Sequence, residues 1–263
     1  MPSTRSLEFS RRFLLPALVI SMLAAARGLA QPPTWLLVNL HPIGAESSQA
    51  FGVSGAAVVG YFSAYARPPQ AAYWGADYVA KTLPGGSGTW PTGINGATIV
   101  GYLRGADAHA LMWPAQDQAP VQLEPAGASA SYALATDGAS QVGSIDSHAV
   151  IWHGAPASIV DVHPVSAWAS TLRAVDRSGV AGDIILAAHG PPHAAIWQGA
   201  GDSVVDLHPA GAYASQGQAI SNGRQGGYVQ YERDGTYYPA VWSGTAESFV
   251  NFSAPGAPTD AGV

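Results

Sequence analysis

Cysteine is absent from this chain of 263 residues, and lysine occurs only once, at Lys81. Without cysteine the chain has no disulfide scaffold, no thiol nucleophile and no cysteine-ligated zinc site. Charged residues make up only 11% of the chain. Because binding to phosphates needs clustered Lys and Arg, this composition predicts no nucleic-acid partner and disfavours binding to anionic lipid headgroups.

Long apolar runs are also missing, except near the N-terminus. Arg5, Arg11 and Arg12 precede an apolar stretch over residues 13–26, and the small residues of Gly28-Leu29-Ala30 follow it. This pattern predicts an export signal peptide over residues 1–30 and a periplasmic or extracellular location. The stretch is too short to span a bilayer comfortably, so we expect no stable membrane insertion after signal removal. Residues 10–14 also resemble the twin-arginine motif, which leaves the export route open.

Beyond residue 30 the chain contains seven basic and sixteen acidic residues, giving a formal charge near −9. The main feature of this region is a sequence motif that is repeated five times. Each copy has a two-residue turn that ends in glycine, then a glycine in a second short strand, then a tryptophan. Spacings between the turn glycines are 41, 42, 41 and 44 residues. The turns are Ser54-Gly55, Asn95-Gly96, Asp137-Gly138, Ser178-Gly179 and Asn222-Gly223.

A period of about 42 residues that holds four short β-type segments is typical of a propeller blade. The sequence therefore predicts an all-β domain over residues 31–256, a five-bladed β-propeller of four-stranded antiparallel blades, with a flexible tail over 257–263. Segments of the fourth-strand type occur six times, at 36–40, 78–83, 121–123, 159–162, 204–207 and 249–252. We expect the extra N-terminal segment to pair with the last blade and close the ring. An open or six-bladed ring is the alternative.

The repeat resembles the bacterial extracellular HAF family. Gly93-Ile94-Asn95-Gly96 followed by Val100-Gly101-Tyr102, the phrase His148-Ala149-Val150-Ile151-Trp152, and Val205-Asp206-Leu207 carry the resemblance, which spans residues 36–252. Leu111, Val150 and Ala195 stand where the family has Phe, and the first and fifth copies lack the His. The resemblance implies a secreted, β-propeller-like surface protein and brings no established chemistry.

The recurring aromatic and histidine positions predict structure before function. We expect the five repeat tryptophans to pack between neighbouring blades, and His109, His148 and His193 to hydrogen-bond to backbone across blades. Equivalent third strands lie too far apart for these histidines to share one metal ion, so the sequence predicts no metal and no other cofactor. The repeat tryptophans are Trp74, Trp113, Trp152, Trp197 and Trp242.

Ligand-binding candidates come from two positions in the repeat. Tyr61, Tyr102 and Tyr228 directly follow the second-strand glycines, where exposed rings could line shallow pockets. The link between copies holds His-Pro pairs, and if these links carry a pocket its histidines would be His41, His163 and His208. Proline turns covered by histidine are the structural alternative.

The sequence favours a non-catalytic binding or scaffold module whose ligand is a carbohydrate or a protein; its oligomeric state stays open. The alternative is a glycoside hydrolase, because five-bladed propellers host such enzymes and two carboxylates are the minimum they need. Asp146, Asp183 and Glu232 are the best candidates, since they come shortly after the second-strand glycines and could reach the rim formed by the loops between second and third strands. First strands carry almost no acidic residues, which counts against this alternative.

Overall fold

We examined a computed structural model, which describes residues 36–199, 203–233 and 235–252. The chain divides into a unit of residues 1–38 and a unit of residues 39–263, and the second unit contains all the strands. The predicted signal peptide and tail lie outside the described residues. None of the described residues belongs to a helix long and apolar enough to span a membrane.

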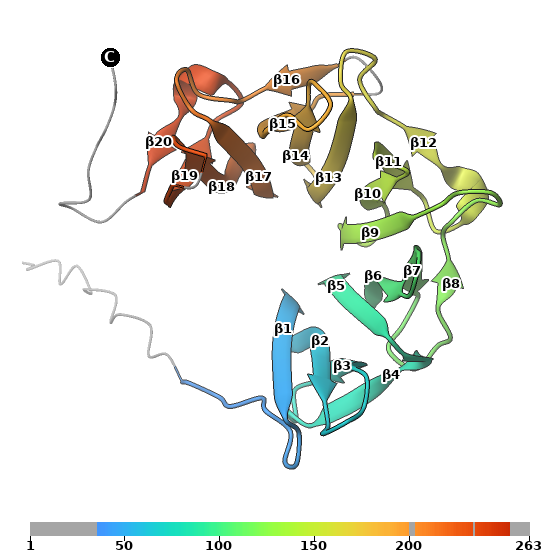
Figure 1. The fold of residues 1–263 in the computed structure, drawn as a ribbon. Helices are drawn as coiled ribbons and strands as arrows, with labels where there is room; N and C mark the ends of the chain where they lie inside the picture. Colours follow the sequence, from blue (N-terminus) through green and yellow to red (C-terminus); the bar gives the residue numbers. More distant parts are fainter. Residues whose placement is uncertain (1–35, 200–202, 234, 253–263) are drawn as a thin grey trace, which may run out of the picture. The chain divides into compact units, whose positions relative to one another are not determined.

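The second unit is a β-propeller-like, all-β architecture of five four-stranded antiparallel sheets, here called blades 1 to 5 (Figure 1). Each blade is built from four consecutive strands, as the repeat predicts. The strands of blades 1 to 3 are β1 Ser47–Ser54, β2 Ala57–Ser63, β3 Gln70–Trp74 and β4 Ala80–Ser87; β5 Thr89–Asn95, β6 Thr98–Arg104, β7 Ala108–Trp113 and β8 Val121–Gln122; β9 Ser131–Thr136, β10 Gln141–Ile145, β11 His148–Trp152 and β12 Val160–Asp161. Those of blades 4 and 5 are β13 Ala169–Asp176, β14 Gly179–Ile185, β15 Pro192–Trp197 and β16 Val204–Asp206; β17 Ala214–Ser221, β18 Arg224–Gln230, β19 Tyr237–Trp242 and β20 Val250–Asn251. Short 3₁₀ turns, Pro156–Ser158 and Ala246–Ser248, precede β12 and β20.

The predicted glycines have a steric reason in each blade. Turn residues such as Gly96, Asn222 and Gly223 have positive φ angles of 57°, 50° and 75°, which suit a tight hairpin. The glycine of each second strand faces a bulge in the first strand, where a Cβ atom would lie only 1.8–2.1 Å from a carbonyl oxygen. These five glycines are Gly60, Gly101, Gly143, Gly182 and Gly227.

Consecutive blades pack face to face through apolar clusters. At the first junction, Val59, Ala71 and Leu83 of blade 1 enclose Trp113 of blade 2, and the other three junctions repeat this arrangement. Four of the repeat tryptophans also donate an indole N–H bond to a carbonyl of the preceding link. The acceptors for Trp74, Trp113, Trp152 and Trp197 are Leu40, Pro84, Leu123 and Val162, at 2.9, 2.6, 2.9 and 2.8 Å. For Trp113, Trp152 and Trp197, burial and this bond together fix the ring between two copies of the repeat.

Blades 1 and 5, the first and last of the series, differ from the predicted closure of the ring. Residues 36–40 form no strand, so the prediction of an N-terminal strand there is wrong, and β20 of the same copy takes the fourth position in blade 5. Strand packing joins blades 1–2, 2–3, 3–4 and 4–5. The end blades expose positions that are buried elsewhere: Val53 is 68% exposed where Ile94 is 8%, and Phe252 is 63% exposed where Leu207 is fully buried.

Candidate functional site

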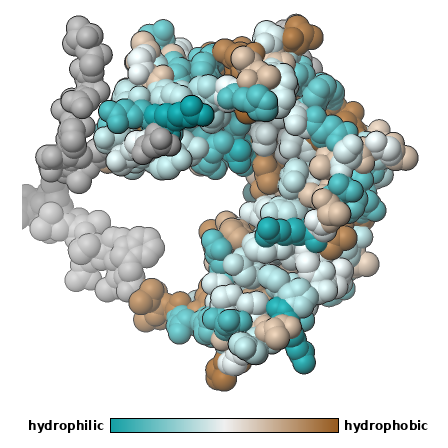
Figure 2. Space-filling view, viewed as in Figure 1, coloured by the Kyte–Doolittle hydropathy of each residue, from teal (hydrophilic) through white to brown (hydrophobic). Residues whose placement is uncertain are grey.

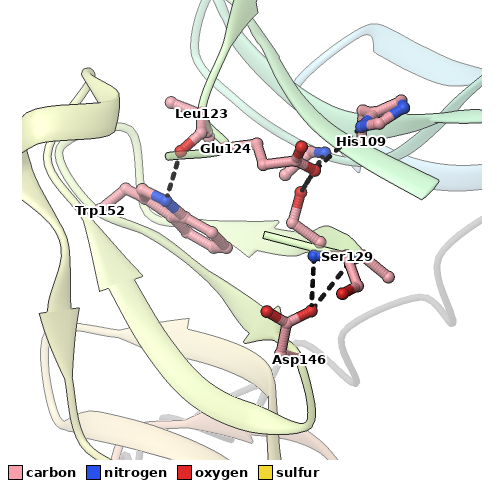
Figure 3. A network of polar contacts seen from close by, with 9 residues as sticks. His109, Leu123, Glu124, Ser129, Asp146 and Trp152 are labelled. Atoms are coloured by element: carbon pink, nitrogen blue, oxygen red, sulfur yellow. Dashed lines mark hydrogen bonds and ion pairs between the residues drawn. The ribbon is translucent and has the colours of Figure 1, made fainter. Parts of the chain in front are cut away.

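The junction between blades 2 and 3 holds a polar network that joins side chains from both copies (Figure 3). His109 donates from Nδ1 to the carboxylate of Glu124 at 2.9 Å, and the Ser131 hydroxyl donates to the same carboxylate at 2.7 Å. The buried N–H of Ala110 in turn donates to Ser131 Oγ at 2.8 Å. Ser131, the first residue of blade 3, therefore accepts a strand N–H of blade 2.

At the next two junctions a histidine stands in the place of Glu124, and the link serine contacts its ring nitrogen in place of a carboxylate. His148 and His193 contact Asp161 and Asp206 through Nδ1, at 3.1 and 2.9 Å. The link histidines, His163 and His208, stack on these rings with centroids 3.9 and 3.8 Å apart. The third-strand histidines thus contact carboxylates of their own copy, and the predicted backbone bond across copies is made by the following residue instead.

The bonds of the link histidines assign the tautomer of the neutral ring. His208 Nε2 lies 3.0 Å from the Ala212 carbonyl, which only accepts, so Nε2 carries the proton and Nδ1 accepts from Ser215 Oγ at 2.9 Å. His41 makes the equivalent contacts with Ala45 and Ser48. Burial, and next the neighbouring His193, lower the pKa of His208; burial and His148 do the same for His163.

These networks do not have the geometry of a catalytic triad. In a triad the histidine bridges the nucleophile and the acid. At the blade 2–3 junction Glu124 stands in the middle instead, and Ser131, Ser170 and Ser215 are all buried. The described residues also contain no group of three or more His, Cys, Asp or Glu side chains placed to hold a metal ion. The junction polar groups therefore act as connectors between blades.

The three candidate acids occupy different environments. Asp146 accepts the backbone N–H groups of Ser129 and Ala130 on one oxygen, each at 2.9 Å. Asp183 is only 4% exposed and pairs with Arg173; burial raises its pKa, against the opposing charge of Arg173. Glu232 is exposed in the β18–β19 loop. Two of the three are thus already engaged by the fold.

The predicted tyrosines lie on second strands and contact rings of first strands or, for Tyr228, of the third strand. Tyr61 lies 4.4 Å from Trp90 between ring centroids and 5.8 Å from Phe51, and the Arg104 guanidinium covers Trp90 at 5.4 Å. Tyr102 meets Tyr132 at 5.1 Å and Tyr228 meets Tyr237 at 4.8 Å.

Sequence reasoning missed the first-strand partners Phe51, Trp90 and Tyr132. The cross-strand pairing was the clue that could have found one of them, because Trp90 lies directly opposite Tyr102 in the register. Figure 2 shows hydrophilic and hydrophobic residues interspersed over the face in view. Such a surface offers aromatic faces beside polar groups.

A cavity of about 840 Å³ lies beside these rings, between blades 3 and 4. Its lining includes Tyr132, Trp168, Asp146, Thr171 and Arg173, which come from first strands, from the link and from the β10–β11 turn. No protein-family model matches the chain, and the search of curated proteins gives no match.

Proposed function

We propose that this chain is an exported, non-catalytic recognition module that binds a glycan through the aromatic groups of its first, second and third strands. The single observation that carries the proposal is the clustering of the second-strand rings Tyr61, Tyr102 and Tyr228 with further rings of first and third strands. The N-terminal pattern and the resemblance to HAF repeats support a location at the cell surface or in the periplasm. In the proposal the five sheets are the blades of a five-bladed β-propeller.

Aromatic rings beside polar groups suit a sugar ring. A pyranose presents apolar C–H faces and a rim of hydroxyls, so it gains from an aromatic face and needs hydrogen-bonding groups at its edge. Tyr61 has the Gln49 side chain within 3.4 Å of its hydroxyl, and Arg104 covers the neighbouring Trp90. Burial raises the pKa of Tyr102 and of Tyr228, so their hydroxyls stay protonated and able to donate at neutral pH.

The state of the acids supports binding over hydrolysis. A glycosidase needs one carboxyl group to donate a proton and a second to act as nucleophile or base, about 5–9.5 Å apart across the scissile bond. Asp183 is buried against Arg173, and Asp146 holds two backbone N–H groups. Neither residue presents a free carboxyl pair to a substrate.

The test is a glycan array followed by titration calorimetry on the chain without residues 1–30. Replacement of Tyr61, Tyr102 and Tyr228 by Ala should abolish glycan capture, whereas Tyr65→Ala, at a ring 85% exposed outside the aromatic groups, should leave it unchanged. Hydrolysis of an arabinan or fructan that disappears in Asp183→Asn would replace the proposal by the glycoside hydrolase. Capture of a protein with no glycan binding would also overturn it.

A further inference from the structure

The cavity between blades 3 and 4 combines two walls of different chemistry. Trp168 is 52% exposed and Tyr132 is 37% exposed, and both residues line the cavity. The Trp168 backbone is fixed, because its N–H donates to the Ile185 carbonyl at 2.7 Å. The polar part of the lining comes from Ser144, Thr171 and the charged side chains of Asp146 and Arg173. A volume of about 840 Å³ lies in the range of small-ligand sites.

The charged groups of this cavity are one ion pair and one separate carboxylate. Arg173 bonds through Nε to Asp183, which leaves its terminal nitrogens for other partners, and its side chain is 29% exposed. Asp146 uses Oδ1 for the two link N–H groups, and its Oδ2 makes no hydrogen bond to any residue in the described part of the chain. One free carboxylate oxygen and the end of a paired guanidinium can accept from and donate to neighbouring hydroxyls.

This arrangement selects against acidic ligands. An acidic sugar would meet the Asp146 carboxylate and a strongly acidic chain, while Arg173 is already neutralised by Asp183. A neutral ligand rich in hydroxyls satisfies the acceptor and the donors together, and its apolar face covers the exposed rings.

The combination of an arginine at the first-strand bulge with a tryptophan in the preceding link occurs in one of the five copies. Arg173 occupies the bulge of its first strand, and the equivalent residues of the other copies are Phe51, Thr92, Leu134 and Gln218. Two residues before the link serine, Trp168 replaces the Glu46, Ser87, Ser129 and Tyr213 of the other copies. The repeat therefore gives one such pocket per chain.

We propose that this pocket binds one neutral mono- or disaccharide unit, stacked on Trp168 and hydrogen-bonded by Asp146 and Arg173. The inference rests on the proposed glycan-binding function and names its specificity site. In this assignment the tyrosines of blades 1, 2 and 5 contact the remainder of the glycan.

The experiment titrates the chain without residues 1–30 by calorimetry with maltose, cellobiose and lactose, and with digalacturonic acid as the charged counterpart. At least one neutral disaccharide should bind with a stoichiometry near one. Trp168→Ala should weaken it at least tenfold and Asp146→Asn at least threefold, because Asn keeps the oxygen that accepts the link N–H groups but loses the second acceptor. Tyr65→Ala is the matched aromatic control, and equal melting temperatures of all variants verify the fold.

The outcomes separate the two proposals. Glycan binding that is lost in Tyr61→Ala or Tyr228→Ala but unchanged in Trp168→Ala overturns the pocket and leaves the proposed function in place. Tighter binding of digalacturonic acid than of every neutral disaccharide overturns the assigned ligand class. Absence of binding to any glycan on the array and in calorimetry overturns both proposals.

Discussion

The link serines provide a quantitative test of how the blades hold together. Ser215 is fully buried; its Oγ accepts the N–H of buried Ala194 at 2.9 Å and contacts His208 Nδ1 at 2.9 Å. Ser215→Ala leaves that N–H without a partner, which costs about 1–3 kcal/mol, and removes the bond to the histidine. We therefore expect about 2–3 kcal/mol of destabilisation, a fall in melting temperature of about 4–12 °C for a domain of this size.

Ser48 is the matched control because it makes the same histidine contact without the strand N–H. His41 Nδ1 lies 2.9 Å from Ser48 Oγ, and no strand N–H in the described part of the chain donates to Ser48. Blade 5 carries Pro239 where the donors Ala110, Ala149 and Ala194 stand, so it needs no serine after it. Ser48→Ala should cost less than about 1 kcal/mol. Urea unfolding followed by tryptophan fluorescence measures both, and equal losses would refute the role given to the buried N–H.

Three further predictions concern pH, glycine sterics and the closure of the ring. The pKa of His163 and of His208 is lowered in the folded chain, so at acidic pH the unfolded chain binds more protons than the folded chain. Folding stability is therefore retained above the ordinary histidine pKa of 6.5 and lost as the pH falls below that value. Melting scans from pH 7.5 to 5 should show a falling melting temperature, and His208→Gln, beside His193 and Asp206, should make this fall smaller. Gly227→Ala places a Cβ atom 1.9 Å from the Gln216 carbonyl and should cost at least about 2 kcal/mol, while Gly226→Ala meets nothing nearer than 3.8 Å and should stay within about 0.5 kcal/mol in denaturant unfolding. Closure of a five-bladed ring can be measured by energy transfer between dyes on the first turns of blades 1 and 5, at Ala56→Cys and Ser221→Cys. This transfer should be as strong as that between Arg177→Cys and Ser221→Cys, whose turns in blades 4 and 5 are joined by the Gly223–Ser178 bond. Weak transfer in the first pair alone would refute closure, and transfer between singly labelled chains would show a second copy instead.

Much of the architecture follows from local chemistry that the sequence displays. Gly96 and Asn222-Gly223 permit the positive φ angles of tight turns, and second-strand glycines such as Gly143 leave room for the bulge opposite. The period of these residues gives the number of sheets and the order of their strands. The segment 36–40 shows the limit of this reasoning, because its residues match a fourth strand but form none.

The candidate site was less predictable because its residues meet across strands and across copies. Tyr61 and Tyr102 were identified from their position after a glycine, but their partners Trp90 and Tyr132 depend on the register of the first strands. Trp168 and Arg173 stand at repeat positions that hold other residue types in the other copies, so the pattern gave no reason to join them. Asp183 looked like a free loop acid in the sequence and is a buried partner of Arg173 in the structure.

The sequence alone thus determined the five copies, their four strands and the exclusion of thiol chemistry, because turns, glycines and composition act locally or in sum. Only the tertiary structure decided the use of the histidines and serines as connectors, the burial of Asp183 and the cavity beside Trp168. Those features arise where neighbouring strands and blades pack against each other, as blades 3 and 4 do. The distances between residues of different strands cannot be read from the order of residues along the chain.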